Sequence, residues 1–330
     1  MSLTIGLTYD LRQDYLDRGH TAEEVAEFDS ASTIDALDAA IRSLGHRTVR
    51  IGHAWELCRR LVAAERWDLV FNIAEGLRGR NREAQVPCLL ELYGVPYVGS
   101  DGLACAVTLD KAVAKRLVAA AGLPTARFHV VAAETDLAAV ALPFPLFAKP
   151  LAEGTGKGID ARSRIDSPAQ LREVCRSLLK QFAQPVLIEE YLPGREFTSA
   201  VLGTGPAARV LGTMEVEILP QAGDAIYSYE NKEKCETLVR YSALARGPLR
   251  DEVESLALAA YRTLECRDMG RVDVRCDAAG RPVFIELNPL PGIHPTHSDL
   301  PMIATQEGLP YEKLIDTIIR SACLRLGIVP

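Results

Sequence analysis

The stretch RVDVRCDAAGRPVFIELN, residues 271–288, alternates charged and apolar side chains on either side of a turn that contains glycine. This alternation predicts two antiparallel strands joined as a hairpin. If a four-residue turn joins the strands, Asp273 lies opposite Phe284 and diagonal to Glu286, and Asn288 belongs to the same face. The hairpin therefore collects three side chains with oxygen donors on one surface.

These three side chains suit a divalent cation. Mg²⁺ prefers oxygen ligands and leaves places for substrate phosphates, so Asp273, Glu286 and Asn288 are predicted to hold it. The alternative is a solvated strand face with charge pairs between the strands. The apolar residues on both flanks favour the metal site.

A glycine-rich turn follows another predicted strand. The sequence KPLAEGTGKG, residues 149–158, places Lys149 at the end of an apolar run and three glycines after it. Backbone N–H groups of such a turn can approach phosphate oxygens, and the lysine adds a positive charge. The order of a Walker loop is absent, so a flexible turn without a ligand is the alternative.

A third pattern is VLIEEYLPGRE, residues 186–196, in which an apolar strand runs into two carboxylates, a Pro-Gly turn and a further strand. Such an element can form a hinge between two domains and present backbone polar groups to the edge of a purine. By itself the pattern predicts a strand, a turn and a strand.

The first hundred residues alternate strands with helices. The alternation predicts a doubly wound parallel sheet, whose ligands bind beyond the carboxyl ends of the strands. Residues 9–30 are too long for a plain connection, so they form either a loop over a site or a disordered insertion. The expected strands are 3–8, 48–51 and 68–73, and the expected helices are 32–44, 55–64 and 83–93.

From residue 127 the pattern changes to a small α+β unit that extends to residue 219. A helix over 251–264 and the hairpin come next, and two helices close the chain. The strands expected in the small unit are 146–149, 186–190, 196–202 and 208–219. We expect three domains: an N-terminal α/β substrate domain over 1–110, a central domain over 111–215 and a C-terminal catalytic domain over 216–330.

The composition is that of an ordinary globular protein, with 48% hydrophobic and 25% charged residues among 330. The 37 Lys and Arg residues and 44 Asp and Glu residues give a net charge of −7, which argues against a nucleic-acid-binding surface. The eight cysteines form no C-x-x-C or zinc pattern, and neither a signal peptide nor a membrane span is evident. We therefore expect a cytoplasmic protein that binds neither nucleic acid nor a membrane.

Taken in order, these segments resemble the D-alanine–D-alanine ligase family of the ATP-grasp superfamily. The likeness runs from residue 68 to residue 319. It implies an α/β ATP-grasp fold, in which central and C-terminal α+β domains clasp ATP. The matching stretches are ELYGVPYVGSDGLACAVTLDKAVAKRLVAAAGLPT, LFAKPLAEGTGKGI, VLIEEYLPGREFT, YSYENK, GRVDVRCD and FIELNPLPG.

The resemblance implies a ligase that uses ATP with Mg²⁺, or with Mn²⁺, to phosphorylate a carboxylate and then joins the acyl phosphate to an amine. Amino acids are the expected substrates, and a homodimer is the expected assembly. The residues that match the family's ATP-binding groups are Lys111 and Lys149 at the phosphates, Thr155 in the covering loop, Glu189 and Glu190 near adenine, Leu192 through its backbone, Glu196 at the ribose and Lys232 in the lid loop over the γ-phosphate.

Around the reacting atoms, the resemblance places Asp273, Glu286 and Asn288 as metal ligands, in agreement with the hairpin face. It also matches Arg271 and Gly292 to the groups that steady the tetrahedral intermediate. An arginine and a backbone N–H are suited to a developing oxyanion.

On the substrate side, Ser298 matches the serine that binds the carboxylate of the second substrate, although one additional residue lies between Gly292 and Pro301. Glu27, just before a predicted helix, matches the glutamate that holds the ammonium group of the first substrate.

The same side also departs from the family's pattern. Glu75 stands where the family has histidine, and Arg80-Asn81 stands where it has an acidic pair. Glu233 replaces the tyrosine after the lid lysine. These changes lie among the groups that face the amino acids, so Glu75 and Arg80 are predicted to contact a substrate more polar or larger than D-alanine.

Two other functions are open at this point. A small-molecule kinase with the same fold would release a phosphorylated product without an amine. A nucleotide-binding protein without catalysis would not need the three metal ligands and both phosphate-binding lysines.

Overall fold

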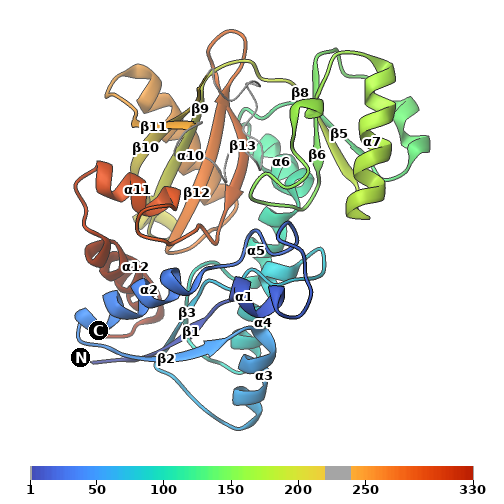
Figure 1. The fold of residues 1–330 in the computed structure, drawn as a ribbon. Coiled ribbons are helices and arrows are strands. Elements are labelled where there is room, and N and C mark those ends of the chain that lie inside the picture. Colours follow the sequence, from blue (N-terminus) through green and yellow to red (C-terminus); the bar gives the residue numbers. More distant parts are fainter. Residues whose placement is uncertain (1, 220–238, 330) are drawn as a thin grey trace.

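The computed structural model describes residues 2–219 and 239–329 (Figure 1). The N-terminal part is a parallel sheet in the order β2-β1-β3-β4, as the alternation of strands and helices predicts. Its strands are β1 (Thr4–Thr8), β2 (Arg47–Gly52), β3 (Leu69–Asn72) and β4 (Tyr97–Val98), and its helices are α2 (Ala31–Ser43), α3 (Ala54–Val62), α4 (Gln85–Leu92) and α5 (Gly102–Leu109).

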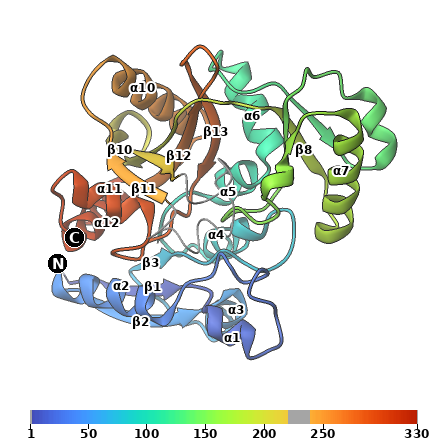
Figure 2. The same ribbon diagram turned by 45° about the horizontal axis from the view of Figure 1, so that its top comes forward.

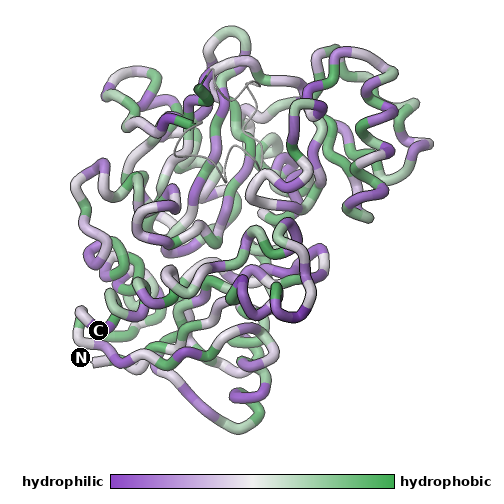
Figure 3. Tube along the Cα trace, in the orientation of Figure 1, coloured by the Kyte–Doolittle hydropathy of each residue, from purple (hydrophilic) through white to green (hydrophobic). Residues whose placement is uncertain are grey.

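The last helix of the described chain, α12 (Tyr311–Leu326), completes this N-terminal part. It lies beside α2 at the lower left of Figure 1. Leu314 and Ile318 of α12 share a buried core with Ile5 and Leu37. Figure 3 shows the underlying pattern, in which hydrophobic and hydrophilic positions alternate along the helices and strands.

Residues 9–30 form an ordered segment with a small core of its own. The segment contains α1 (Arg12–Leu16) and buries Tyr15, Val25 and Phe28 against one another. The Tyr15 hydroxyl donates to Asp10 at 2.5 Å, and Ser30 caps α2. The segment is therefore folded and is not a disordered insertion.

The second sheet is antiparallel, in the order β5-β8-β6-β7. Helix α7 (Pro168–Phe182) covers it through Leu171, Cys175 and Leu178. Its strands are β5 (Phe128–Val131), β6 (Leu146–Pro150), β7 (Arg164–Ile165) and β8 (Val186–Glu190); α6 (Lys111–Ala120) precedes the sheet, and the 3-10 helices η2 (Glu134–Ala139) and η3 (Ala161–Ser163) lie in its connections.

The third sheet has the order β11-β10-β9-β12-β13 and is covered on one face by α10 (Pro248–Thr263). Figure 2 shows it beside the second sheet. Its strands are β9 (Glu196–Leu202), β10 (Arg209–Ile218), β11 (Val239–Ala243), β12 (Met269–Cys276) and β13 (Pro282–Asn288); the remaining elements are η1 (Arg82–Ala84), η4 (Gly205–Ala207) and α11 (Asp299–Gln306).

The assignment of β9 and β10 to the small central unit was wrong. β9 pairs with β12 along its whole length, and Phe197 and Val201 of β9 pack into the core beneath α10 with Val272 and Val274 of β12. Partners this distant in sequence leave no local signal, so the sequence order of the strands was misleading. The three-domain division at residues 110 and 215 stays a prediction.

One buried carboxylate joins the N-terminal part to the third sheet. Asp268, directly before β12, is fully buried and accepts the backbone N–H of Gly99 at 2.9 Å. It pairs with Arg325 of α12 at 2.7 Å and also accepts the hydroxyls of Thr204 and Ser321. The contacts of Asp268 therefore connect the end of β4, the start of β12 and α12.

Replacing Asp268 by alanine should lower the free energy of unfolding by about 3–5 kcal/mol, because the Arg325 guanidinium would lose its carboxylate in the protein interior. Urea unfolding followed by circular dichroism measures this loss. The matched control is Asp316→Ala, which removes the surface pair with Arg320 on α12 and should cost less than about 1 kcal/mol. Equal, small losses in both variants would contradict the role assigned to Asp268.

Candidate functional site

A cavity lies between the second and third sheets. Both sheets supply charged side chains to its wall, and carboxylates outnumber cations there. The charged residues that line it are Lys149 of β6, Glu189 and Glu190 of β8, Glu196 of β9, Arg271, Asp273 and Arg275 of β12, Glu286 of β13 and Asp299 of α11. All of these charged residues except Arg275 and Asp299 were predicted from the sequence. With Leu192, which also lines the cavity, the structure thus brings together eight of the predicted residues.

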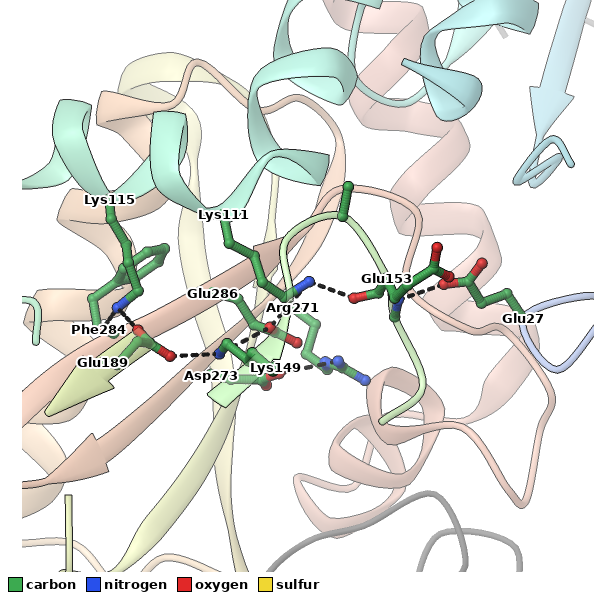
Figure 4. Close-up of polar contacts among 12 residues, drawn as sticks. Glu27, Lys111, Lys115, Lys149, Glu153, Glu189, Arg271, Asp273, Phe284 and Glu286 are labelled. Carbon is green, nitrogen blue, oxygen red and sulfur yellow. Dashed lines mark hydrogen bonds and ion pairs between the residues drawn. The ribbon is translucent and has the colours of Figure 1, made fainter. Parts of the chain in front are cut away.

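At the inner end of the cavity, Glu189 is held between two lysines (Figure 4). Its carboxylate lies 2.5 Å from Nζ of Lys115 and 2.9 Å from Nζ of Lys149, and all three side chains are buried. Burial alone would raise the pKa of Glu189, but the two ammonium groups hold it below its ordinary value. Lys115 also donates to the backbone oxygen of Phe284, so this cluster joins α6 to both sheets.

The hairpin of β12 and β13 presents its carboxylates to the cavity in a different register from the predicted one. Asp273 lies directly opposite Glu286, and the register shifts after Asp273, so that Ile285 is passed over and Phe284 pairs with Val274. Phe284 was predicted on the Glu286 face, but it is fully buried in the core beneath α10. A β-bulge turns the strand by one residue, and the alternation of side chains breaks there.

The metal-ligand candidates lie on neighbouring positions of this hairpin. Asn288 lies opposite Arg271, two residues from Glu286, and its Oδ1 accepts the backbone N–H of Leu290 at 3.0 Å. The Thr198 hydroxyl donates to Oδ1 of Asp273 at 2.8 Å. These contacts orient the oxygen atoms of both side chains.

Two predicted phosphate-binding lysines converge on Glu286. Nζ of Lys111 lies 3.6 Å and Nζ of Lys149 lies 3.9 Å from Oε2 of Glu286. Lys111 is the first residue of α6 and also donates to the backbone oxygen of Glu153 in the glycine-rich turn. The two lysines, the carboxylate of Glu286 and the glycine-rich turn therefore lie next to one another.

The glycine-rich turn is fastened to the N-terminal part through Glu27 (Figure 4). Glu27 accepts the backbone N–H of Gly154 at 2.6 Å and pairs with Arg82 at 3.1 Å and Lys157 at 3.0 Å. A Cβ atom on Gly154 would lie 2.5 Å from Oε1 of Glu27, so glycine permits this approach. Thr155, next in the turn, has a left-handed φ of 53°, a conformation that is strained for a β-branched residue.

Two glutamates near Glu27 and Arg82 have raised pKa values. Burial raises the pKa of Glu83 to about 7; the guanidinium of Arg82 opposes the rise and the carboxylate of Glu27 adds to it. Burial, together with the carboxylate of Glu83, also raises the pKa of Glu75 well above its ordinary value. Within the described chain, Oε2 of Glu83 has no hydrogen-bond partner.

Other predicted residues lie outside the cavity wall. Arg80 is mostly exposed and pairs with Asp110, the N-cap of α6, at 2.5 Å. The buried cation of that segment is Arg82 instead. Ser298 accepts the backbone N–H of His294 at 3.0 Å and packs against Gly292. Lys232 lies outside the described residues.

Among the residues predicted to lie near adenine and the ribose, Glu190 is partly exposed and pairs with Arg127, and Glu196 pairs with Arg275 at 3.1 Å. Leu192, which lies between these two glutamates in the sequence, also lines the cavity. Glu189 and Glu190, adjacent in sequence, therefore have different partners: Glu189 pairs with two buried lysines and Glu190 with the exposed Arg127.

Comparison with known proteins identifies this arrangement. The family described as D-ala D-ala ligase C-terminus matches residues 117–320. A D-alanine–D-alanine ligase of Bordetella petrii is 36% identical over 268 residues, which cover 80% of this chain and 79% of that protein. The chain belongs to the D-alanine–D-alanine ligase family.

Further relatives agree with this membership. The uncharacterized protein y4sG of Sinorhizobium fredii is 32% identical over 309 residues, or 86% of this chain and 85% of that protein. The D-alanine–D-alanine ligase of Bacillus anthracis, solved with ATP, superposes with a TM-score of 0.74 at 21% identity over 98% of both chains. The VanG D-Ala:D-Ser ligase of Enterococcus faecalis gives 0.75 at 22% identity, over 98% of this chain and all of the other. The predicted family and ATP-grasp fold are confirmed.

The donor set of the hairpin fits a magnesium ion. Asp273 and Glu286 offer carboxylate oxygens from paired positions and Asn288 a carbonyl oxygen, which are hard ligands. Across residues 2–219 and 239–329, no three His, Cys, Asp or Glu side chains gather as a metal site, so a site here would need Asn288 or the nucleotide to complete it. In the same ranges, no helix is long and apolar enough to cross a membrane.

Five residues of the site were missed from the sequence. Lys115 and Lys157 lie in stretches that already hold a predicted lysine, Arg82 lies two residues beyond the predicted Arg80, and Arg275 lies two residues beyond Asp273. Asp299 lies between Gly292 and Pro301, where the sequence has one residue more than the family's pattern. This departure was a signal that the segment differs from the family. Charged residues next to a recognised motif position were therefore the signal that was overlooked.

The raised pKa of Glu83 has a consequence for stability. A carboxyl group with a higher pKa in the folded protein stabilises the fold at low pH, and this contribution is lost as the pH rises through the folded pKa. The free energy of unfolding should therefore fall between about pH 5 and about pH 8, and Glu83→Gln should make that fall shallower by on the order of 1–3 kcal/mol.

Urea unfolding at a series of pH values measures both curves. The control Glu65→Gln, which alters a surface pair with Arg60, should leave the pH dependence unchanged. A Glu83→Gln curve parallel to that of the unmodified protein would contradict the assignment.

Proposed function

We propose that the protein is a ligase that uses ATP to activate a carboxylate as an acyl phosphate and then joins it to an amine, with ADP and phosphate as products. One observation carries this proposal: Lys111 and Lys149 converge on Glu286 in the cavity that also holds Asp273 and Arg271. The lysines, whose charge can stabilise a transferring phosphoryl group, thus lie in the same cavity as Arg271, which can stabilise an oxyanion at a carbonyl carbon.

The chemistry follows from the weakness of a carboxylate as an electrophile. A carboxylate oxygen attacks the γ-phosphorus, and the bond to the ADP oxygen breaks. The amine nitrogen then attacks the carbonyl carbon, the C–N bond forms, the C–O bond to phosphate breaks, and the nitrogen gives up its proton. Lys149 and Lys111 would spread the phosphoryl charge, and Arg271 would stabilise the oxyanion.

Asp273, Glu286 and Asn288 would hold Mg²⁺, which when bound supplies positive charge to the nucleotide phosphates. Glu286 lies beside two lysines and Asp273 beside Arg271, so each carboxylate already has a positive partner. A nucleotide polyanion brought into a wall rich in carboxylates needs such a cation.

The adenine and ribose would lie near the Pro-Gly turn after β8. Leu192 would offer its backbone, and Glu196, held by Arg275, would accept the ribose hydroxyls. Thr155 would cover the phosphates from the glycine-rich turn. A cytoplasmic location and a homodimer remain predictions.

The substrates are proposed to differ from two D-alanines. Glu27, which matches the family's ammonium-binding glutamate, is paired with Arg82 and Lys157, and Glu75 replaces the family's histidine. Oε2 of Glu83, buried near both glutamates, has no hydrogen-bond partner among the described residues, and it would stay unsatisfied beside an apolar substrate group. A polar or larger amino acid or amine fits such a site better.

The deciding experiment measures ADP release and product mass with D- and L-amino acids and small peptides. We expect an amide product, with little ADP release when D-alanine is the sole amino acid. A phosphorylated product formed without an amine would favour the kinase alternative. A clear preference for D-alanine would overturn the proposed specificity and leave the ligase function intact.

Asp273→Asn and Glu286→Gln should each lower kcat by at least about 100-fold, because each removes a charged oxygen donor from the metal. Both variants should keep the circular dichroism spectrum and melting temperature of the unmodified protein. Near-normal turnover of both at saturating Mg²⁺ would refute the metal assignment.

Lys149→Ala should weaken ATP binding by about tenfold or more, since a phosphate would lose a charge-assisted hydrogen bond. Glu189 keeps Lys115 as its partner in this variant, so the fold should survive. Isothermal titration calorimetry with ATP measures the change. The control Lys313→Ala, on α12, should bind ATP normally, and unchanged binding by Lys149→Ala would mean that the glycine-rich turn is not a phosphate site.

A further inference from the structure

A buried lysine of α6, Lys115, belongs to the charged cluster at the inner end of the cavity (Figure 4) but has no role in the proposed chemistry. Its Nζ lies 2.5 Å from Oε1 of Glu189, 2.9 Å from Oγ1 of Thr125 and 3.4 Å from the backbone oxygen of Phe284. An ammonium group has three N–H donors, and three oxygen atoms surround this one. None of the side chain is exposed, so Lys115 is placed to act on its neighbours and not on a ligand.

Lys149 contacts the other oxygen of the same carboxylate. Its Nζ lies 2.9 Å from Oε2 of Glu189, and the residue lines the cavity. Its other acidic neighbour, Oε2 of Glu286, is more distant at 3.9 Å. Of the two lysines that hold Glu189, Lys149 is therefore the one that a nucleotide phosphate can reach, and Glu189 offsets part of its charge.

The Glu189 carboxylate acts on both lysines. Burial lowers the pKa of the Lys115 ammonium group, and the carboxylate opposes this effect. Burial also acts against the charged form of Lys149, but the carboxylates of Glu189 and Glu286 raise the pKa of Lys149 above its ordinary value. A buried carboxylate is strongly destabilising when its cationic partner is removed. If Lys149 turns toward a ligand, Lys115 therefore has to remain beside Glu189.

We propose that Lys115 is a positioning residue for ATP: it keeps Glu189 paired, so that Lys149 can direct its charge to the nucleotide phosphates. Without Lys115, Lys149 would be the one ammonium partner left to Glu189 within residues 2–219 and 239–329. Donation from Lys149 to a phosphate would then weaken the ion pair of a buried carboxylate. The inference rests on the proposed use of ATP and explains how Lys149 becomes available for it.

A double-mutant cycle on Lys115 and Glu189 tests this role. Isothermal titration calorimetry gives the Kd for ATP in the presence of Mg²⁺ for the unmodified protein, Lys115→Met, Glu189→Gln and the double variant. Methionine is similar in length to lysine, and glutamine is similar in shape to glutamate, but neither carries a charge. The surface control is Lys313→Ala on α12. Circular dichroism and the melting temperature establish that each variant is folded.

Lys115→Met should weaken ATP binding by at least about fivefold when Glu189 is present, because the buried carboxylate then depends on Lys149 alone. In the Glu189→Gln background the same substitution should change Kd by less than about twofold, since no carboxylate competes there for Lys149. If Lys115→Met does not fold, Lys115→Gln takes its place, because the amide can still donate to Thr125 and Phe284 without a charge.

Equal losses of ATP affinity in the two backgrounds would overturn the inference, because a lysine that only fills space, or that attracts the phosphates directly, does not act through Glu189. Normal ATP binding by Lys115→Met would overturn it too. Failure of both neutral variants to fold would show that Lys115 serves the fold, against the inference. If the unmodified protein does not bind ATP, the proposed function itself fails, so the two failures are distinguishable.

Discussion

The arrangement of the site depends on one buried carboxylate that pairs with two lysines. Glu189 of β8 lies between Lys115 of α6 and Lys149 of β6. An unpaired ammonium group in the interior would be strongly unfavourable, so these three charges have to be buried together or not at all. Lys115 also donates to the backbone of β13, so the cluster links the two sheets that form the cavity.

The same pairing of opposite charges extends across the cavity. Lys149 and Lys111 approach Glu286, Asp273 and Asp299 flank Arg271, and Glu27 joins Arg82 to Lys157. Each group is oriented by a partner of opposite charge before any ligand arrives. Preorganised charges of this kind need little rearrangement when a polyanion binds.

The sequence predicted much of the fold because its signals were local. Alternating strands and helices indicated the N-terminal parallel sheet, and the hairpin pattern indicated β12 and β13. The sheet partner of β9 could not be predicted in this way, since β12 lies far along the chain. The bulge after Asp273 was also invisible, because a shift of one residue depends on how Phe284 fits the core beneath α10.

For the site, motif positions were easier to predict than their partners. The hairpin face brought Asp273 and Glu286 into one cavity, whereas the choice between Arg80 and Arg82 depended on burial that the sequence does not reveal. Burial decides the role of such residues: Arg80 meets solvent and Asp110, while Arg82 lies inside with Glu27.

The packing of α12 on the N-terminal sheet affects how the chain can fold during synthesis. The strands of that sheet leave the ribosome early, but Leu314 and Ile318, which complete their core, are made long afterwards. Until then, the core that contains Ile5 and Leu37 lacks the part of its packing that α12 supplies. The nascent chain must therefore wait for its distal helix, and the N-terminal part cannot reach its final packing as an independent early folding unit.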